Sequence, residues 1–328
     1  KVLGLDPDDP ISIIGPKEPG GAPYGKSIGG KKAHEARPEH RIDLMVTHQA
    51  KKWIEENSEQ PFFVNVALVA PHVPLSPGRE FRGKSELGVY GDFVEQMDWC
   101  VGQIFQTLEE CGVADNTIVM FTSDNGAVVH REPIQHGHRS NRDWLGQKTD
   151  AWEGGVRVPF IVRWPGTVEA GTTSDALFSL ADICKTVWDA VDVKPENNTA
   201  LNSVSQLPVW TGAKESVRAE MMHLGIFGYA LRSGAWVYVP YQGSGGVTTK
   251  FEMPGWLRLP GIGQANSDID ETGHLNADAP DAQLYNLKTD PSQTRNVIGE
   301  HPEKAAEMTA CFKALHKQMT DEYERNLK

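Results

Sequence analysis

The stretch Asn116–Gly126, N-T-I-V-M-F-T-S-D-N-G, is the most informative part of this sequence for the fold. Its first half is a short apolar run of the length typical of a buried strand. Its second half, Thr122–Gly126, is polar and follows directly at the carboxyl end of that predicted strand. In open α/β sheets, ligands bind at this end because the loops that leave the strands meet there. The sequence therefore predicts a ligand site at Thr122–Gly126.

Predicted helices and strands alternate on both sides of this stretch. Three segments are predicted to be helices: Arg41–Asn57, Tyr90–Cys111 and Ser179–Val191. Two further apolar runs, Phe62–Leu68 and Pro159–Trp164, are predicted to be strands. The nearly continuous apolar character of Phe62–Leu68 is expected of a strand that is buried on both faces of a parallel sheet. The alternation predicts an α/β fold, a doubly wound domain with a mostly parallel sheet.

The composition and the pattern of predicted elements change near both ends of this predicted domain. Residues 1–33 are rich in Gly, Pro and Lys and are predicted to be an irregular crossover. We assign residues 34–215 to the α/β domain and 216–328 to a small C-terminal α+β subdomain. The subdomain is predicted to contain strands at Ala230–Pro240 and Gln283–Leu287, and a closing helix from Pro302 to about Arg325.

Composition excludes several classes of protein. The chain has 328 residues, of which 39% are hydrophobic, and no apolar run approaches the ~18 residues that a membrane span requires. Its 32 Lys and Arg against 44 Asp and Glu leave a net charge of −12, the wrong sign for a protein that neutralises nucleic acid phosphates. The four cysteines are too few for a disulfide scaffold, and the absence of a C-x-x-C pair disfavours zinc or redox chemistry.

Four polar residues beside predicted strands are candidates for chemistry. Asp124 and Asn125 offer adjacent hard oxygen ligands, which suit Ca²⁺ or Mg²⁺, although Asp-Asn-Gly is equally typical of an ordinary turn. His72, between Pro71 and Pro74, is a candidate anion ligand or general acid, or a loop histidine without function. Lys148 is able to bind an oxyanion or to be a solvated surface lysine. Taken one at a time, these residues favour the interpretation without a function: a turn, a loop histidine and a solvated lysine.

The order of the motifs resembles the type I sulfatases of the alkaline phosphatase superfamily over residues 40 to about 325. Four stretches carry the resemblance: F-F-V-N-V-A-L-V-A-P-H-V-P (Phe62–Pro74), T-S-D-N-G (Thr122–Gly126), G-Q-K-x-x-x-W-E-G-G-V-R-V-P-F-I-V-R-W-P-G (Gly146–Gly166) and Q-L-Y-N-L-K-T-D-P-S-Q-T-R-N-V (Gln283–Val297). The resemblance implies an alkaline phosphatase-like fold and a sulfuric ester hydrolase. A sulfated carbohydrate is the implied substrate, because bacterial polysaccharide-degrading enzymes carry similar sequences. It also implies export to the periplasm or the extracellular space.

The resemblance implies a role for each matched residue. Asp124 and Asn125 would be two ligands of a Ca²⁺ ion that holds the sulfate oxygens, and His72 and Lys148 would contact the sulfate ester. The segment Gly137–Arg139 resembles one that faces the sugar in bacterial polysaccharide sulfatases. His138 and Arg139 are therefore the candidate substrate-recognition pair.

In this family, three motifs are expected before the region with which this chain begins. They are an Asp-Asp pair after the first strand, a C-x-P-S-R or S-x-P-S-R motif whose Cys or Ser becomes formylglycine, and a K-x-H motif. Neither C-x-P-S-R nor S-x-P-S-R occurs among the 328 residues. Asp8-Asp9 is rejected as the metal pair because no apolar strand precedes it. We expect the chain to be the C-terminal part of a sulfatase and to be inactive alone, with formylglycine and the remaining Ca²⁺ ligands in a preceding segment. A natural protein that has lost catalysis is the alternative.

Two further functions stay open at this point. A phosphodiesterase or phosphonate hydrolase of the same superfamily would share the metal site and differ in its nucleophile. A non-catalytic protein that binds sulfated glycans would keep an anion site made of His72, Lys148, His138 and Arg139.

Overall fold

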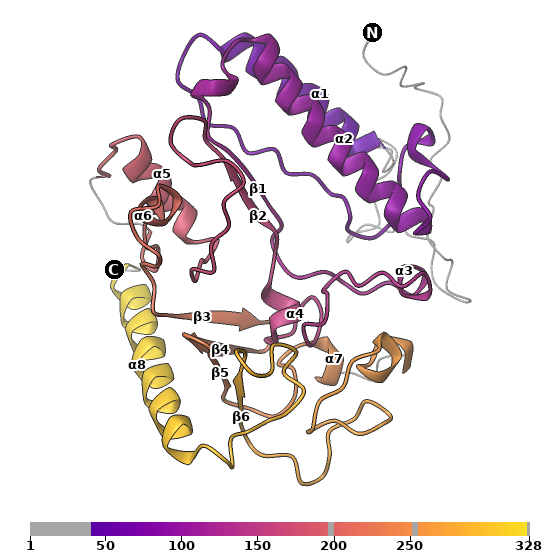
Figure 1. The fold of residues 1–328 in the computed structure, drawn as a ribbon, viewed down its shortest axis with the longest axis vertical. Coiled ribbons are helices and arrows are strands. Elements are labelled where there is room, and N and C mark those ends of the chain that lie inside the picture. The colour runs from indigo at the N-terminus through magenta and orange to yellow at the C-terminus, as the bar shows by residue number, and fades with distance from the viewer. Residues whose placement is uncertain (1–40, 196–199, 251–254, 327–328) are drawn as a thin grey trace. The chain divides into compact units, whose positions relative to one another are not determined.

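The computed structural model describes residues 41–195, 200–250 and 255–326 (Figure 1). The crossover predicted over residues 1–33 lies outside this described part. The chain divides into two compact units, of which the first is Lys1–Thr117 with Glu132–His138 and the second is Ile118–Arg131 with Arg139–Lys328. Residues on both sides of position 215 belong to the second unit, and the domain boundary at 215/216 stays a prediction.

Two helices form the body of the first unit. Helices α1 (Ile42–Asn57) and α2 (Gly88–Glu110) lie side by side, as their apolar periodicity predicts (Figure 1). Two short 3₁₀ turns, η2 (Arg79–Phe81) and η3 (Ala114–Asn116), flank α2 in the chain. Buried apolar residues between these elements form two clusters, one of Leu44, Phe81 and Cys100 and one of Ala70, Leu75, Tyr90 and Phe93. The predicted helices in this unit are confirmed.

The strand predicted at Phe62–Leu68 is not a strand in the described structure. Exposure still alternates along the segment, with one set of side chains partly covered and the other exposed, and Phe63 is 71% exposed. This period of two is typical of extended backbone with one covered face. A β-strand also needs a hydrogen-bonded neighbour, and the described residues place none beside this segment. The prediction of burial on both faces is therefore wrong here.

In the second unit, the strand after which Asp124 lies is confirmed. Strand β1 (Val119–Thr122) pairs with β2 (Phe160–Arg163), and Thr122 lies opposite Phe160. The two strands are antiparallel, whereas the sequence predicts a mostly parallel sheet. The short helices α3 (Arg131–Gln135) and α4 (Glu153–Val156) lie between them in the chain.

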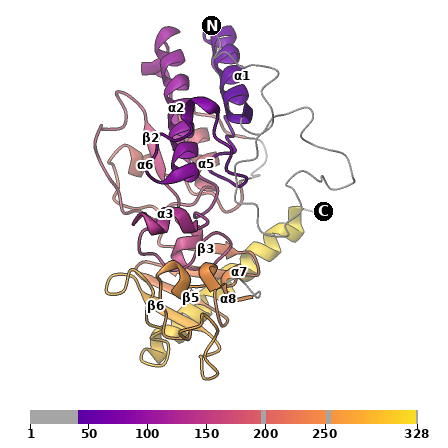
Figure 2. The ribbon, with the colours of Figure 1, turned by 90° about the vertical axis from the view of Figure 1, so that its right-hand side faces the viewer.

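A second sheet forms the C-terminal α+β part of this unit. Its four strands are antiparallel in the order β3 (Glu220–Gly225), β4 (Gly228–Ser233), β5 (Trp236–Val239) and β6 (Gln283–Asn286). Helix α8 (Pro302–Asn326) packs on the sheet over a core of Leu231, Tyr238, Leu284 and Met308 (Figure 2). The connection before β6 carries α7 (Val247–Lys250), η4 (Gly255–Leu257) and η5 (Pro260–Ile262).

The segment predicted as one strand, Ala230–Pro240, is a hairpin. Ser233 lies opposite Trp236, so Gly234 and Ala235 form a two-residue turn between β4 and β5. Gly234 has φ of 52°, a value that glycine adopts without steric cost and that suits tight hairpin turns. The prediction missed the turn because apolar residues continue on both sides of this glycine.

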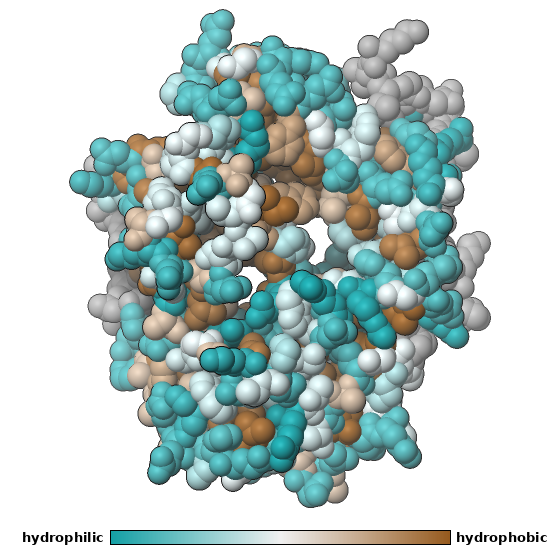
Figure 3. Space-filling view, viewed as in Figure 1, coloured by the Kyte–Doolittle hydropathy of each residue, from teal (hydrophilic) through white to brown (hydrophobic). Residues whose placement is uncertain are grey.

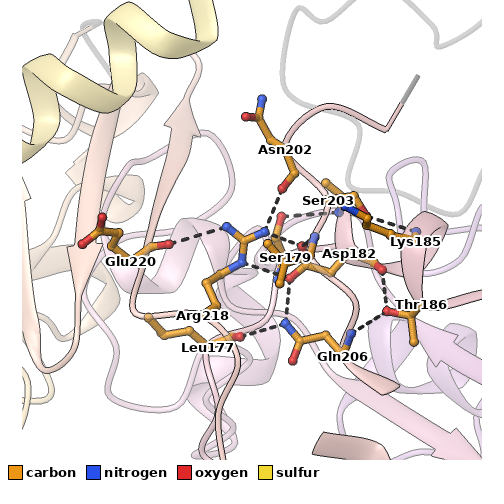
Figure 4. A network of polar contacts seen from close by, with 12 residues as sticks. Leu177, Ser179, Asp182, Lys185, Thr186, Asn202, Ser203, Gln206, Arg218 and Glu220 are labelled. Atoms are coloured by element: carbon orange, nitrogen blue, oxygen red, sulfur yellow. Dashed lines mark hydrogen bonds and ion pairs between the residues drawn. The ribbon is translucent and has the colours of Figure 1, made fainter. Parts of the chain in front are cut away.

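A buried polar network joins α5 (Asp182–Ala190) to the start of β3 (Figure 4). The carboxylate of Asp182 is fully buried and accepts hydrogen bonds from Arg218 Nε at 3.1 Å and from Arg218 Nη2. It also accepts three neutral hydrogen bonds, from Ser179 N (3.0 Å), Val204 N (2.9 Å) and Gln206 Nε2 (2.9 Å). Helix α5 is followed in the chain by α6 (Leu207–Trp210). Asp182 thus holds together segments that are distant in the sequence, because a buried carboxylate needs donors for its oxygens.

Exposed apolar residues are scattered over the described surface. The face drawn in Figure 3 is mostly hydrophilic, with apolar residues in separate groups. At the turn between β3 and β4, Leu224, Ile226 and Phe227 are each at least half exposed. Within the described ranges, no helix combines the length and the apolar character needed to cross a membrane.

Candidate functional site

The acidic loop lies where the sequence predicts it, directly after β1. Asp124 is exposed, and its Oδ1 accepts a hydrogen bond from Ser123 Oγ at 3.4 Å. Asn125 is half-buried, and its amide nitrogen donates to the Gly126 carbonyl at 3.0 Å. The side-chain carbonyl of Asn125 and the carboxylate of Asp124 are hard oxygen ligands. The loop therefore offers two donors of the type that Ca²⁺ or Mg²⁺ takes.

Gly126 brings this loop against the main chain of α4. Its amide nitrogen donates to the Gly155 carbonyl at 2.9 Å. A Cβ atom on Gly126 would lie 1.9 Å from the Gly154 carbonyl oxygen, so any larger residue would separate the two segments. The glycines of T-S-D-N-G and of W-E-G-G are thus required by close main-chain approach.

Lys148 lies on a loop of residues 145–151, the Lys148 loop, which is hydrogen-bonded to the residues following Asn125. Its amide nitrogen donates to the Ala127 carbonyl at 3.0 Å, and its side chain is half-buried. Asn141 joins the same segments, since its Oδ1 accepts from Ala127 N at 2.9 Å and its Nδ2 donates to Gly146 O at 3.2 Å. The structure thereby brings together the backbone of two motifs that the sequence analysis treated as separate candidates.

Asp150 is a buried carboxylate in the Lys148 loop that the sequence analysis did not single out. It accepts hydrogen bonds from Gln147 N at 2.9 Å and from Thr248 Oγ1 at 2.6 Å. Burial raises the pKa of Asp150 to about 6, and hydrogen bonds from Thr248 and Gln147 oppose that rise. Its carboxylate shapes the turn that follows Lys148. The position of Asp150 two residues after Lys148 was a local sequence signal for a residue of the site. Its burial could not be predicted, because it depends on Thr248, which is distant in the sequence.

Glu153 and Arg157 form the ion pair that their spacing on one helical turn allows. Glu153 Oε2 lies 2.5 Å from Arg157 Nε and 3.1 Å from Arg232 Nη1. The Glu153 side chain is buried and shared between the two arginines, one of which comes from β4. This pair holds α4 and has a structural role.

His72 lies in the first unit, on an exposed turn after the extended segment. Its Nδ1 is 2.5 Å from the Val73 carbonyl, so Nε2 is the nitrogen left for a ligand. The base of the turn is held by Asp43 of α1, whose carboxylate accepts from Val69 N at 2.6 Å and Ala70 N at 3.0 Å. Burial raises the pKa of Asp43, and these two amides oppose the rise. The turn is therefore anchored to α1.

The two residues of the predicted recognition pair belong to different units. In the first unit, the His138 ring lies 5.7 Å from the Tyr90 ring, measured between centroids. In the second unit, Arg139 is exposed and its Nη1 donates to the Ile262 carbonyl at 2.9 Å. Each side chain is thus held within its own unit, and their joint role in sugar recognition stays a prediction.

The two predicted calcium ligands, Asp124 and Asn125, do not make a complete metal site within the described residues. Across the described ranges, no cluster of three or more His, Cys, Asp or Glu side chains could hold a metal ion. Asp124 and Asn125 fit Ca²⁺ in donor chemistry, but they supply two of the roughly six to eight oxygens that this ion takes. They are suited to be part of a calcium site.

Comparison with known proteins identifies the class to which this chain belongs. A family model described as Sulfatase matches residues 22–193, which is more than half of the chain. The chain therefore belongs to the sulfatase family.

Two curated relatives match with different extents. The chain is 30% identical over 350 residues to an N-acetylgalactosamine-6-O-sulfatase of Bacteroides thetaiotaomicron, a match that covers 96% of this chain and 63% of the relative. It is 43% identical over 173 residues to human steryl-sulfatase, covering 52% of this chain and 30% of that enzyme. The chain thus spans less than two thirds of the length of these relatives.

Solved structures confirm the α/β fold class of the alkaline phosphatase-like sulfatases. One, from work on the metabolism of multiple glycosaminoglycans by Bacteroides thetaiotaomicron, has a TM-score of 0.70 at 30% identity and covers 84% of this chain and 55% of its own. A sulfatase from Pseudoalteromonas has a TM-score of 0.66 at 22% identity, which supports the fold alone.

Proposed function

We propose that the protein carrying this sequence is a sulfuric ester hydrolase that removes O-sulfate from a sulfated carbohydrate. The observation that carries the proposal is the main-chain hydrogen bonding between the Lys148 loop and the residues directly after Asp124 and Asn125, in a chain of the sulfatase family. The substrate class is supported by the relative named N-acetylgalactosamine-6-O-sulfatase and by the solved structure from work on the metabolism of multiple glycosaminoglycans.

In this proposal, Asp124 and Asn125 would supply two of the oxygen ligands of a Ca²⁺ ion. The ion would neutralise charge on the sulfate oxygens. Lys148, on the adjacent loop, contacts the sulfate ester as a compact positive charge and stabilises the charge that develops during cleavage. His72 offers Nε2 to the oxygen of the leaving alcohol and donates a proton to it.

The nucleophile of the proposed reaction is formylglycine. Its C-x-P-S-R or S-x-P-S-R motif does not occur among the 328 residues, so we place it, with the other Ca²⁺ ligands, on further chain. We propose His138 and Arg139 as the residues that contact the sugar, and the periplasm or the extracellular space as the location.

The test is release of sulfate from sulfated N-acetylgalactosamine and glycosaminoglycan oligosaccharides by the whole gene product. Lys148→Met is expected to lower kcat/KM by about 100-fold or more, the size typical for loss of one charge-stabilising group. The control is Lys214→Met, because Lys214 is exposed and lies outside the loops described above.

One outcome would refute the role of Lys148, and two would refute the proposed function. Sulfate release that is unchanged in Lys148→Met would remove Lys148 from the site. Faster cleavage of a phosphodiester or phosphonate than of any sulfate ester would favour the related hydrolases. Tight binding of the oligosaccharide without release would favour a binding protein.

A further inference from the structure

The loop that carries Lys148 is held by two buried glutamine side chains, one on the last strand of the C-terminal sheet and one after that strand. Gln283 lies on β6 and Gln293 lies seven residues after that strand ends. Both are fully buried, and both hydrogen bond to residues of the W-E-G-G segment. They are 131 and 140 residues away from their partners in the sequence.

The amide of Gln283 uses all of its hydrogen-bonding capacity. Its Oε1 accepts from Trp152 Nε1 at 2.9 Å and from the Tyr285 hydroxyl at 2.6 Å. Its Nε2 donates to the carbonyls of Tyr241 at 2.8 Å and Gly243 at 2.7 Å. A side-chain amide has two donor hydrogens and two acceptor lone pairs, so these four bonds leave none of them unpaired. The Trp152 ring, itself fully buried, is thereby fixed to β6.

Gln293 holds the next residue of the same segment. Its Oε1 accepts from the Glu153 amide nitrogen at 2.8 Å, at the first residue of α4. Gln293 has φ of 50°, in the region that residues other than glycine rarely adopt. Its main-chain carbonyl also accepts from Asn266 Nδ2 at 2.7 Å. The backbone at Gln293 is therefore held in an uncommon conformation that presents its side chain to Glu153.

Main-chain hydrogen bonds connect this anchored segment to Lys148. Gly154 N donates to the Leu145 carbonyl at 2.7 Å, which closes the loop around Lys148. Ala151 N donates to the Ser244 carbonyl at 2.7 Å, so the residue before Trp152 is tied to the connection before β6 as well. A displacement of Trp152 or Glu153 would move the start and the end of the Lys148 loop together.

We propose that Gln283 and Gln293 are positioning residues for Lys148, so that the geometry of the anion-binding loop depends on the C-terminal sheet. This inference rests on the proposed role of Lys148 in contacting sulfate. It gives the Q-L-Y-N-L stretch a function beyond packing, since its first residue joins the sheet to the loop. Substrate binding depends on the C-terminal sheet even where the sheet contributes no contact to the substrate.

Hydrogen exchange measured by mass spectrometry on the full chain tests the proposal. Gln283→Leu removes four bonds while keeping similar side-chain volume. We expect exchange of the amides in residues 145–157 to become on the order of tenfold faster, beyond any change in the rest of the second unit.

Asn296→Leu is the matched control. The Asn296 amide also makes four hydrogen bonds, to Leu284 N, Ile298 N, Asp268 Oδ2 and Ala282 O, and none reaches the Lys148 loop. Faster loop exchange in Gln283→Leu than in Asn296→Leu, at equal loss of Tm, supports positioning. Equal loop exchange in the two variants overturns it. If Gln283→Leu fails to fold, Gln293→Leu replaces it, with the Glu153 amide as the expected first site of faster exchange.

A second measurement uses sulfate ester kinetics of the whole gene product. Gln283→Leu is expected to raise KM at least fivefold more than Asn296→Leu does. Faster loop exchange together with no activity in the unsubstituted protein would support positioning and refute the proposed function. If the unsubstituted protein is active but loop exchange is equal in Gln283→Leu and Asn296→Leu, the positioning role is refuted and the proposed function stands.

Discussion

Removing the guanidinium of Arg218 tests whether the buried network around Asp182 stabilises the second unit. In Arg218→Met the fully buried carboxylate keeps its three neutral donors and loses its charged partner. The Arg218 side chain is only 12% exposed, so water compensates little of this loss. Breaking a buried ion pair by removing one partner costs about 3–5 kcal/mol.

The assay is urea unfolding of the wild-type chain and its variants, with Tm as a second measure. A loss of about 3–5 kcal/mol corresponds to a decrease in Tm on the order of 10 °C for a unit of this size. Arg295→Met is the control, because Arg295 pairs with Glu300 at 2.7 Å but both side chains are more than half exposed. We expect the control to cost less than about 1 kcal/mol.

A double variant separates charge from packing. Asp182→Asn in the Arg218→Met background removes the uncompensated charge and is expected to recover part of the stability. If Arg218→Met costs no more than Arg295→Met, the buried pair does not stabilise this unit and the reasoning fails.

Four further predictions follow from the site. The raised pKa of Asp150, about 6 in the folded chain, means that folding favours its protonated form, so its contribution to stability falls as the pH rises from about 4 to 6. Asp150→Asn should flatten that decline, and identical pH slopes in urea unfolding would contradict it. Gly126→Ala places a Cβ 1.9 Å from the Gly154 carbonyl and should cost about 2 kcal/mol or more, whereas Gly102→Ala on α2 meets nothing within 4 Å and should be neutral or stabilising in the same unfolding assay. Chelation of divalent cations should abolish sulfate release by the whole gene product, and Asp124→Ala should raise the Ca²⁺ concentration that restores it. The purified 328-residue chain should release no sulfate from an aryl sulfate, and turnover that depends on Lys148 would refute this.

The candidate site joins residues of very different local character. Asp124 and Asn125 follow a strand, whereas Lys148 lies on a loop that depends on glycines, on Asp150, on Gln283 of the second sheet and on Gln293 after it. Placing a charged group on a loop requires such support, because a loop has few bonds of its own. In the proposal made above, Lys148 therefore takes its position from hydrogen bonds that reach its loop from distant parts of the second unit.

Local sequence patterns determined the parts of this protein that depend on neighbouring residues. The helical periodicity of residues 42–57 and the apolar run before Thr122 predicted α1 and β1 correctly, because side-chain spacing along one element encodes both. The placement of Asp124 and Asn125 after β1 followed from the same pattern. The motifs also pointed to the sulfatase family, to which the chain belongs.

Tertiary structure alone decided the rest. The extended segment at Phe62–Leu68 has the composition of a strand, but a strand exists only where a second segment completes its hydrogen bonds. The anchoring of Trp152 by Gln283 joins residues 131 positions apart, and the burial of Asp150 depends on Thr248. Polar residues such as these carry no periodic signal, because their burial is decided by distant partners that satisfy their hydrogen bonds.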